Sequence, residues 1–332
     1  MRAVVMQGPA ALTVVDVADP EPGPGEVVLE VALTGVCATD LHILDGHFPT
    51  ARFPLIPGHE VTGTVVALGR EVGNLREGDR VVVDPAVPCT TCLLCRRGRP
   101  NLCENRNAVG VTRNGGAAER VAVTAASCHR VPEGVTAQAA VLSEPLACVL
   151  HAFDLVPAPV AQRVLVYGAG TIGLLAVHLA CHLGAHRLDV VDTNADRLPA
   201  ARRVGAAAAT RPEGLPAGRA DWDLVVDATG AAAAITDGVS RVQRGGTFLQ
   251  IGVAPADAVV PLSPYQLFAR EITLVGSMTT RHTFPAALRL LERGIIDVEL
   301  LVEEPVPLSD YAEAVARVRA GRSLKVVVGP DR

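Results

Sequence analysis

Lysine is almost absent from this chain of 332 residues, because Lys325, near the C-terminus, is the only one. Tyrosine is nearly as rare, and none of Tyr167, Tyr265 and Tyr311 is followed four residues later by lysine. The sequence therefore excludes a Tyr-x-x-x-Lys catalytic pair. Schiff-base chemistry needs a reactive amine, and the one candidate lies in a strand-like run near the end of the chain. Redox or carbonyl chemistry here must use other groups.

Long apolar stretches and basic runs are also missing. No segment has the ~18 consecutive apolar residues of a membrane span, and no run of Lys and Arg could follow a phosphate backbone. We therefore expect no membrane and no nucleic-acid partner. The N-terminus has neither the basic cluster nor the apolar segment of a signal peptide, so we expect a cytoplasmic protein. Hydrophobic residues still make up 49% of the chain, enough for two folded domains.

The hydrophobic pattern changes near residue 160. Before it, short alternating stretches and Pro/Gly turns are typical of β-strands. After it, apolar runs alternate with helical patterns, which favours an α/β fold with a doubly wound parallel sheet. The predicted strands are 163–167, 188–192, 224–228, 247–251 and 272–276, and the predicted helices between them are 171–184, 195–204 and 231–242.

A glycine-rich turn follows the first of these strands and opens a helix. It reads Gly168-Ala-Gly170-Thr171-Ile172-Gly173. In a strand–turn–helix setting such glycines allow a tight turn, close approach of the backbone to a pyrophosphate, and close packing of helix on strand. The N-terminus of the helix offers free N–H groups to the phosphates. The turn therefore predicts binding of a dinucleotide.

Residues at the ends of the later strands complete this site. Asp192 ends the second strand, where a carboxylate would bind the adenosine ribose hydroxyls and repel a 2′-phosphate, which favours NAD over NADP. Arg197 would flank the adenine, although a surface arginine is an equal alternative. Thr229 and Gly252 follow later strands at the same edge, where we expect the nicotinamide half.

Four cysteines form a compact cluster: Cys89, Cys92, Cys95 and Cys103, separated by two, two and seven residues. Four thiolates at such spacing can close a tetrahedral zinc site. Disulfides and an iron–sulfur cluster are the alternatives, but the first is disfavoured in a cytoplasmic chain and the loop-rich setting favours zinc over the second. Four thiolates leave no open position, so this zinc would be structural.

Further groups able to bind a metal or move a proton lie in the strand-rich part. They are Gly35-Val-Cys37-Ala-Thr39-Asp40-Leu-His42, Gly58-His59-Glu60 and Ser143-Glu144-Pro145-Leu146. In this order, together with the cysteine loop and the glycine-rich turn, they resemble the zinc-dependent medium-chain alcohol dehydrogenases over nearly the whole chain. The resemblance implies a mostly β, GroES-like catalytic domain at 1–147 and 278–332. It implies a Rossmann-type NAD-binding domain at 148–277.

The resemblance also implies roles for individual residues. Cys37 and His59 would bind a catalytic zinc, and Glu60 would be a ligand or an exchanging one. Asp40 would accept the free ring N–H of His59. Thr39 would hydrogen-bond the alcohol oxygen, and His42 would complete a proton relay to solvent.

The third protein ligand departs from the best-known branch, because Glu144 stands where those enzymes have cysteine. Glutamate there is similar to the sorbitol, polyol and threonine dehydrogenases, in which it binds zinc directly or through water. Cys148 would then lie near the nicotinamide. A carboxylate makes zinc harder and more tolerant of a second hydroxyl, which suits a vicinal diol.

The implied activity is transfer of a hydride from a secondary alcohol (a polyol, sugar or cyclitol) to NAD⁺, reversibly, with two zinc ions per chain. Two alternatives remain: a threonine-type dehydrogenase of β-hydroxy amino acids, and a zinc-free quinone reductase or nucleotide-sensing relative. The family resemblance further implies a homodimer or homotetramer, with its contact at residues 265–276.

Overall fold

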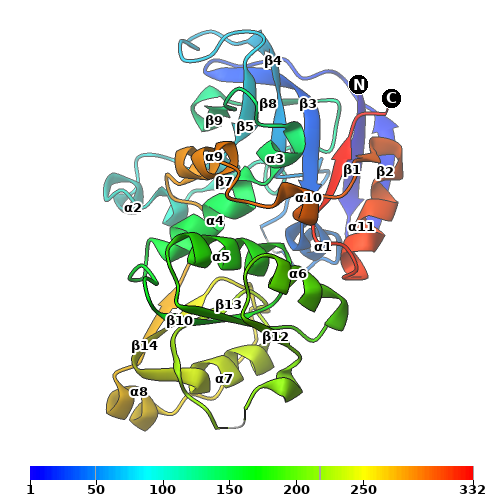
Figure 1. Cartoon of the computed structure of the whole chain (residues 1–332). Helices are drawn as coiled ribbons and strands as arrows, with labels where there is room; N and C mark the ends of the chain where they lie inside the picture. Colours follow the sequence, from blue (N-terminus) through cyan, green and yellow to red (C-terminus); the bar gives the residue numbers. More distant parts are fainter. Residues whose placement is uncertain (49, 217, 332) are drawn as a thin grey trace. The chain divides into compact units, whose positions relative to one another are not determined.

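The structure, a computed structural model, describes residues 1–48, 50–216 and 218–331 (Figure 1). The chain folds into two compact units. The first unit comprises Met1–Glu144, Thr280–Gly294 and the residues from Val298 onward, and the second comprises Pro145–Thr279 with Ile295–Asp297. The chain passes from the first unit to the second within helix α4 (Ser143–Phe153).

The first unit is built on a mixed sheet, which has seven strands in the part of the chain that the structure describes. The order is β16 (Val306–Pro307), β17 (Val326–Gly329), β3 (Glu26–Val36), β4 (Glu60–Leu68), β5 (Arg80–Val83) and β9 (Cys128–Arg130), and β8 (Arg120–Thr124) also pairs with β3. Two separate strand pairs are β1 (Arg2–Gly8) with β2 (Ala11–Asp16), and β6 (Ala86–Val87) with β7 (Asn107–Ala108). Apart from β16 with β17, neighbouring strands are antiparallel.

Alternation along β3 supplies two faces of this sheet with apolar side chains. Val27, Leu29 and Val31 belong to one buried cluster, and Val36 belongs to another, which also contains Val328 of β17. The surrounding helices are α1 (Ala38–Leu44), α2 (Leu93–Arg96), α3 (Ala137–Val141), α9 (Phe284–Glu292), α10 (Val298–Leu301) and α11 (Tyr311–Arg319). Helix α11 packs beside β17, and an ion pair between Arg2 and Asp331 joins the two ends of the chain (Figure 1).

The second unit is a parallel sheet of six strands within the described chain. Their order is β12 (Ala208–Thr210), β11 (Arg187–Val191), β10 (Arg163–Tyr167), β13 (Trp222–Asp227), β14 (Val242–Gln250) and β15 (Thr273–Gly276). In chain order this is 3-2-1-4-5-6, the doubly wound arrangement of dinucleotide-binding folds. Helices α5 (Thr171–His182) and α6 (Leu198–Arg203) cover one face and α7 (Ala232–Arg241) the other, while α8 (Pro264–Arg270) precedes β15 (Figure 1).

Burial explains why the strands of this sheet are uninterrupted runs of apolar residues in the sequence. Val164, Leu165 and Val166 of β10 are all fully buried, because helices cover both faces of the strand. The predicted fold class, a doubly wound parallel sheet beside a mostly β domain, is therefore confirmed. No helix within the described ranges is long and apolar enough to cross a bilayer.

Candidate metal centres and nucleotide site

Cys37 lies between the end of β3 and the start of α1, as the residue that caps the helix. The backbone N–H of Cys37 donates to Asp40 Oδ2 at 2.9 Å, and the N–H of Asp40 donates to the carbonyl of Cys37 at 3.0 Å. These reciprocal bonds satisfy groups that the first turn of a helix would leave unpaired. They also fix the backbone that carries the Cys37 thiol.

Asp40 connects this turn to the segment that carries His59. The carboxylate is fully buried, and its Oδ1 accepts the N–H of Gly58 at 3.3 Å. His59 Nδ1 lies 3.8 Å from the same oxygen, which is ion-pair distance but too long for a hydrogen bond. Asp40 thus joins the turn at Cys37 to the segment at Gly58. The predicted hydrogen bond from the His59 ring to Asp40 stays a prediction.

Two glycines allow the site to close. A Cβ on Gly35 would lie 1.8 Å from Glu60 Oε2, so any other residue would expel the carboxylate. A Cβ on Gly115 would lie 2.1 Å from the Gly58 carbonyl oxygen, so the Gly115-Gly116 turn packs directly against the backbone before His59. The glycines therefore set where Glu60 and His59 lie.

The Cys37 thiol, the His59 imidazole and a Glu60 carboxylate oxygen lie within 4.8 Å of one another. Burial alone would lower the pKa of His59, but Asp40 and Cys37 raise it well above its usual value, so the surroundings favour positive charge at this point. Sulfur, nitrogen and oxygen donors of this kind are those of zinc sites. A zinc ion therefore fits the residues that are present.

Lys325, which the sequence analysis set aside, lies in this centre. Its ammonium donates to both oxygens of Glu60, at 2.6 and 2.7 Å, and both side chains are buried. Burial alone would lower the pKa of Lys325, but Glu60 and Cys37 raise it, so the amine remains charged. A single lysine within an apolar run was the sequence signal for such a partner.

Three further residues were predicted for this centre: Thr39, His42 and Glu144. Thr39 lies in the first turn of α1, with Oγ1 4.0 Å from Cys37 Sγ, and His42 lies in the last turn. Glu144, in the first turn of α4, is not among the three donors that lie within 4.8 Å of one another in the described chain. Its charge nonetheless raises the pKa of Lys325, behind larger contributions from Glu60 and Cys37.

The four predicted cysteines of the loop also come together. The sulfurs of Cys89, Cys92, Cys95 and Cys103 lie within 4.8 Å of one another, and all four are free and partly buried. The backbone N–H of Cys92 donates to Cys89 Sγ at 3.4 Å, and the N–H of Cys95 donates to Cys92 Sγ at 3.5 Å. The N–H of Cys92, followed by Thr91, lowers the pKa of Cys89 to about 5, which favours the thiolate that a metal requires.

The glycine-rich turn has the geometry that its sequence predicts. Gly168 has a φ of +100° directly after β10, and Gly170 precedes the first residue of α5. A Cβ on Gly173 would lie 1.8 Å from the Gly168 carbonyl oxygen. The turn therefore brings the N-terminus of α5, with Thr171 and Ile172, to the carboxyl edge of the sheet, where anions bind.

Asp192 directly follows β11 at the same edge. Its Oδ2 accepts the N–H of Ala169 at 2.6 Å and its Oδ1 accepts the N–H of Asn194 at 2.7 Å. The Arg197 guanidinium lies 4.0 Å from Asp192 and 3.5 Å from where a Cβ on Gly170 would be. Arg197 Nε is buried and has no hydrogen-bond partner among the described residues.

Two later loops meet at this edge through Asp227. Its buried carboxylate accepts from Thr229 Oγ1 at 2.6 Å, Gly230 N at 2.9 Å and Gln250 Nε2 at 2.6 Å. A Cβ on Gly252 would lie 2.2 Å from the Gly230 nitrogen, so the loops are in contact. Cys148 lies on α4, in the part of this helix that belongs to the second unit.

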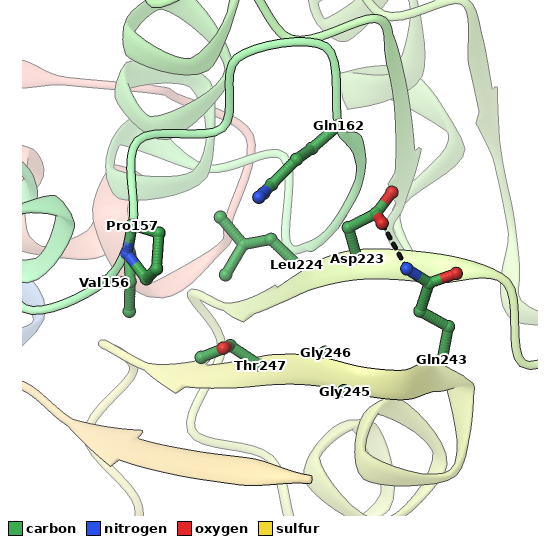
Figure 2. A pocket seen from close by; sticks show the side chains of 9 residues that line it. All are labelled: Val156, Pro157, Gln162, Asp223, Leu224, Gln243, Gly245, Gly246 and Thr247. Atoms are coloured by element: carbon green, nitrogen blue, oxygen red, sulfur yellow. Dashed lines mark hydrogen bonds between the residues drawn. The ribbon is translucent and has the colours of Figure 1, made fainter. Parts of the chain in front are cut away.

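A small pocket occupies the opposite edge of the sheet. It has a volume of about 100 Å³, and Figure 2 shows its lining: Val156, Pro157, Gln162, Asp223, Leu224, Gln243, Gly245, Gly246 and Thr247. Asp223 accepts from Gln243 and from the N–H of Arg163. These residues lie at the amino ends of β10, β13 and β14, whereas dinucleotides bind at the carboxyl ends. The pocket is therefore separate from the nucleotide site.

Fold and donor sets together are those of a zinc-binding dehydrogenase, and comparison with known proteins agrees. Residues 23–133 match the alcohol dehydrogenase GroES-like domain, and residues 171–293 match the zinc-binding dehydrogenase domain. The chain belongs to the zinc-dependent medium-chain alcohol dehydrogenase family, in its polyol branch.

Three proteins represent the similarity. D-arabinitol dehydrogenase 1 of Uromyces fabae is 36% identical, over 100% of this chain and 97% of its own length. D-altritol 5-dehydrogenase of Agrobacterium fabrum (strain C58) is 38% identical, over 92% of both chains. The crystal structure of a zinc-binding dehydrogenase of Sinorhizobium meliloti 1021 bound to NADP covers 99% of both chains, with a TM-score of 0.95 and 32% identity.

Proposed function

We propose that this chain is a zinc-dependent polyol dehydrogenase, which transfers a hydride from a secondary alcohol of its substrate to NAD⁺. The observation that carries the proposal is the cluster of Cys37, His59 and Glu60, whose donor atoms lie within 4.8 Å of one another. A zinc ion there supplies a Lewis acid, which lowers the pKa of an alcohol.

The residues of this centre have distinct tasks. Cys37 and His59 bind the metal, and Asp40 fixes both of their segments through the N–H groups of Cys37 and Gly58. Glu60 is held by the two bonds from Lys325, which keep its charge compensated whether or not it reaches the metal. Thr39 would hydrogen-bond the alcohol oxygen and pass its own hydroxyl proton on as it accepts that of the alcohol, and His42 would complete this proton relay toward solvent.

The substrate class is a polyhydroxy compound. Glu144 in place of a cysteine leaves a harder metal, which tolerates a second hydroxyl. The two relatives named for D-arabinitol and D-altritol support the same class. Glu144 completes the site directly or through a water molecule.

NAD is the proposed cofactor, although a similar structure contains NADP. The Asp192 carboxylate lies beside the glycine-rich turn, with a hydrogen bond of 2.6 Å to Ala169. A 2′-phosphate at this place would meet a buried negative charge, and the Arg197 guanidinium already lies 4.0 Å from that charge. We expect kcat/KM to be higher with NAD⁺ than with NADP⁺.

A threonine-type activity is the weaker candidate. It needs a group that binds the substrate carboxylate, and Arg52 and Arg113 are the two candidates that the sequence offers. The Arg113 guanidinium forms an ion pair with Glu26 at 2.5 Å, so Glu26 already neutralises the charge that would bind a substrate carboxylate. Of the two candidates, Arg52 is then the one left for a substrate carboxylate.

A second copy of the chain is the proposed partner. β15 is one of the two edge strands of the second sheet as described, and close to it in the sequence Tyr265, Phe268 and Val259 are 71%, 83% and 86% exposed. An open strand edge flanked by apolar side chains is a site of association. Phe268→Asp should shift the protein toward monomer in analytical ultracentrifugation, while Val160→Asp, at a residue 63% exposed elsewhere on this unit, should not.

The cytoplasm is the proposed compartment. All eight cysteines are free, including four whose sulfurs lie close together. Free thiols at such distances are typical of a reducing environment.

The function is tested by NADH formation from the zinc-loaded protein with a panel of pentitols, hexitols, aldoses, inositols, L-threonine and simple alcohols. Turnover concentrated on polyhydroxy compounds supports the proposal. A higher kcat/KM for monohydric alcohols or for L-threonine contradicts the substrate class. Two zinc ions per chain and tight NAD binding without any turnover would leave the chemistry intact and point to a more specialised alcohol.

A further inference from the structure

Tyr311, the first residue of α11, is the largest of the fully buried side chains in the described chain. It belongs to an apolar cluster with Val36, Val326 and Val328. Its hydroxyl is buried and has no hydrogen-bond partner among the described residues. A buried hydroxyl without a partner is costly, so phenylalanine would be the better residue if this position served packing alone.

The surroundings of this hydroxyl point to the metal centre. Helix α11 contacts α1, the helix that carries Asp40. Burial first, and then the charges of Asp40, Cys37 and Glu60, raise the pKa of Tyr311 well above its usual value. A tyrosine hydroxyl can donate a hydrogen bond, and Leu41, which follows Asp40 in α1, packs against the cluster that contains Tyr311.

A second buried hydroxyl, that of Thr34, has no hydrogen-bond partner within the described ranges. Thr34 stands opposite Val328 in the β3–β17 register and two residues before Val36, so its side chain is on the sheet face that Tyr311 covers. A Cβ on Gly58 would lie 2.7 Å from Thr34 Oγ1, and the Gly58 N–H donates to Asp40. Thr34 thus touches the segment that Asp40 fixes.

We propose that Tyr311 and Thr34 are positioning residues for the metal-binding histidine. Their hydroxyls form a buried hydrogen-bond network with the Asp40 carboxylate, completed by an internal water, and this network fixes the segment from Gly58 to His59. A buried water with two to four polar partners is the usual way in which such groups are satisfied. The inference rests on the proposed metal-binding role of Cys37 and His59.

Two substitutions remove one hydroxyl each with little change in volume: Tyr311→Phe and Thr34→Val. The matched control is Thr34→Ser, which keeps the hydroxyl. Three quantities are measured: the affinity for zinc by chelator competition, kcat as a function of pH, and the Tm of the metal-free protein. The relevant zinc is the one that is lost in Cys37→Ser.

We expect Tyr311→Phe and Thr34→Val each to weaken zinc binding by roughly tenfold or more, the effect typical of residues that orient a metal ligand. The double variant should lose less than the product of the two, because both act through one network. The pH profile of kcat should move in both variants, and the Thr34→Ser control should match the wild type.

The outcome that overturns this inference is a Tyr311→Phe variant with unchanged zinc affinity, an unchanged pH profile and a raised metal-free Tm. That result would mean that Tyr311 only packs and that its hydroxyl is a cost. If the wild type itself binds no zinc at Cys37, the proposed function fails and this inference with it. If the wild type binds it and both variants are unchanged, only this inference fails.

Discussion

The two donor sets of the first unit differ in how the chain assembles them. The four cysteines lie within residues 89–103, and backbone N–H groups of the same loop donate to their sulfurs. Cys37 and His59 come from two segments and depend on Asp40, while Glu60 depends on Lys325, which is 265 positions away. The comparison teaches that one loop can bring four donor atoms together by itself. The three donors of the other set depend on bonds to residues elsewhere in the fold.

The largest expected effect separates the chemistry of the two sets. Cys37→Ser should lower kcat/KM by about a thousandfold or more, because the loss of a Lewis acid worth several kcal/mol removes about tenfold in rate for every 1.4 kcal/mol. The folded structure should persist, because the Asp40 bond is made to the backbone of Cys37. Zinc content, steady-state kinetics and circular dichroism measure the three quantities. A variant that keeps both zinc ions and wild-type activity would contradict the catalytic assignment.

Breaking the buried ion pair should show how far the first centre depends on the fold. Lys325→Met leaves Glu60 buried and uncompensated, which should lower the free energy of unfolding by about 3–5 kcal/mol. Lys325→Arg keeps the charge and serves as the control. Urea denaturation at pH 7 measures the difference. A Lys325→Met variant as stable as Lys325→Arg would mean that the pair contributes nothing.

A substitution in the cysteine loop should lower stability more than it lowers the initial activity. Cys103→Ala should remove the structural zinc and lower the Tm, because a metal that binds only the folded loop adds its binding free energy to stability. The activity measured at once, at low temperature, should fall less than in Cys37→Ser. Thermal melts and activity after timed incubation separate the two effects. If initial turnover is lost as completely as in Cys37→Ser, the two sets are not independent.

The smallest effect is expected at Asp40. Asp40→Asn keeps an acceptor oxygen for only one of the N–H groups of Cys37 and Gly58, because the amide NH₂ cannot accept the other, and it removes the negative charge. We expect zinc binding at Cys37 to weaken by roughly tenfold, with four-cysteine zinc binding unchanged. Chelator competition measures both sites in one titration. Equal weakening at the two sites would show that Asp40 acts on general stability.

Local patterns were enough to predict much of this molecule. The turn from Gly168 to Gly173 and the cysteine loop are each defined by residues close in sequence, so spacing alone indicates the donor groups. The parallel sheet follows from apolar strands that alternate with helices, and the structure has the strands within a few residues of their predicted places.

Contacts between distant segments were not predictable. The pairing of Lys325 with Glu60 depends on where β17 adds to the sheet, and nothing local to either residue specifies it. The same holds for Tyr311, whose partner helix α1 lies at the other end of the sequence. The sequence shows only that lysine and tyrosine are scarce, and scarcity alone does not indicate which residues Lys325 and Tyr311 contact.

The most direct test of the account measures zinc content and polyol-dependent NADH formation on the same samples. The wild type, the chelator-treated wild type and the zinc-restored protein are compared with Cys37→Ser. The account predicts two zinc ions per chain in the active wild type, loss of activity with the loss of one zinc, and recovery when zinc returns, but no recovery in Cys37→Ser. Polyol oxidation by Cys37→Ser at the wild-type rate, with one zinc per chain, would contradict it.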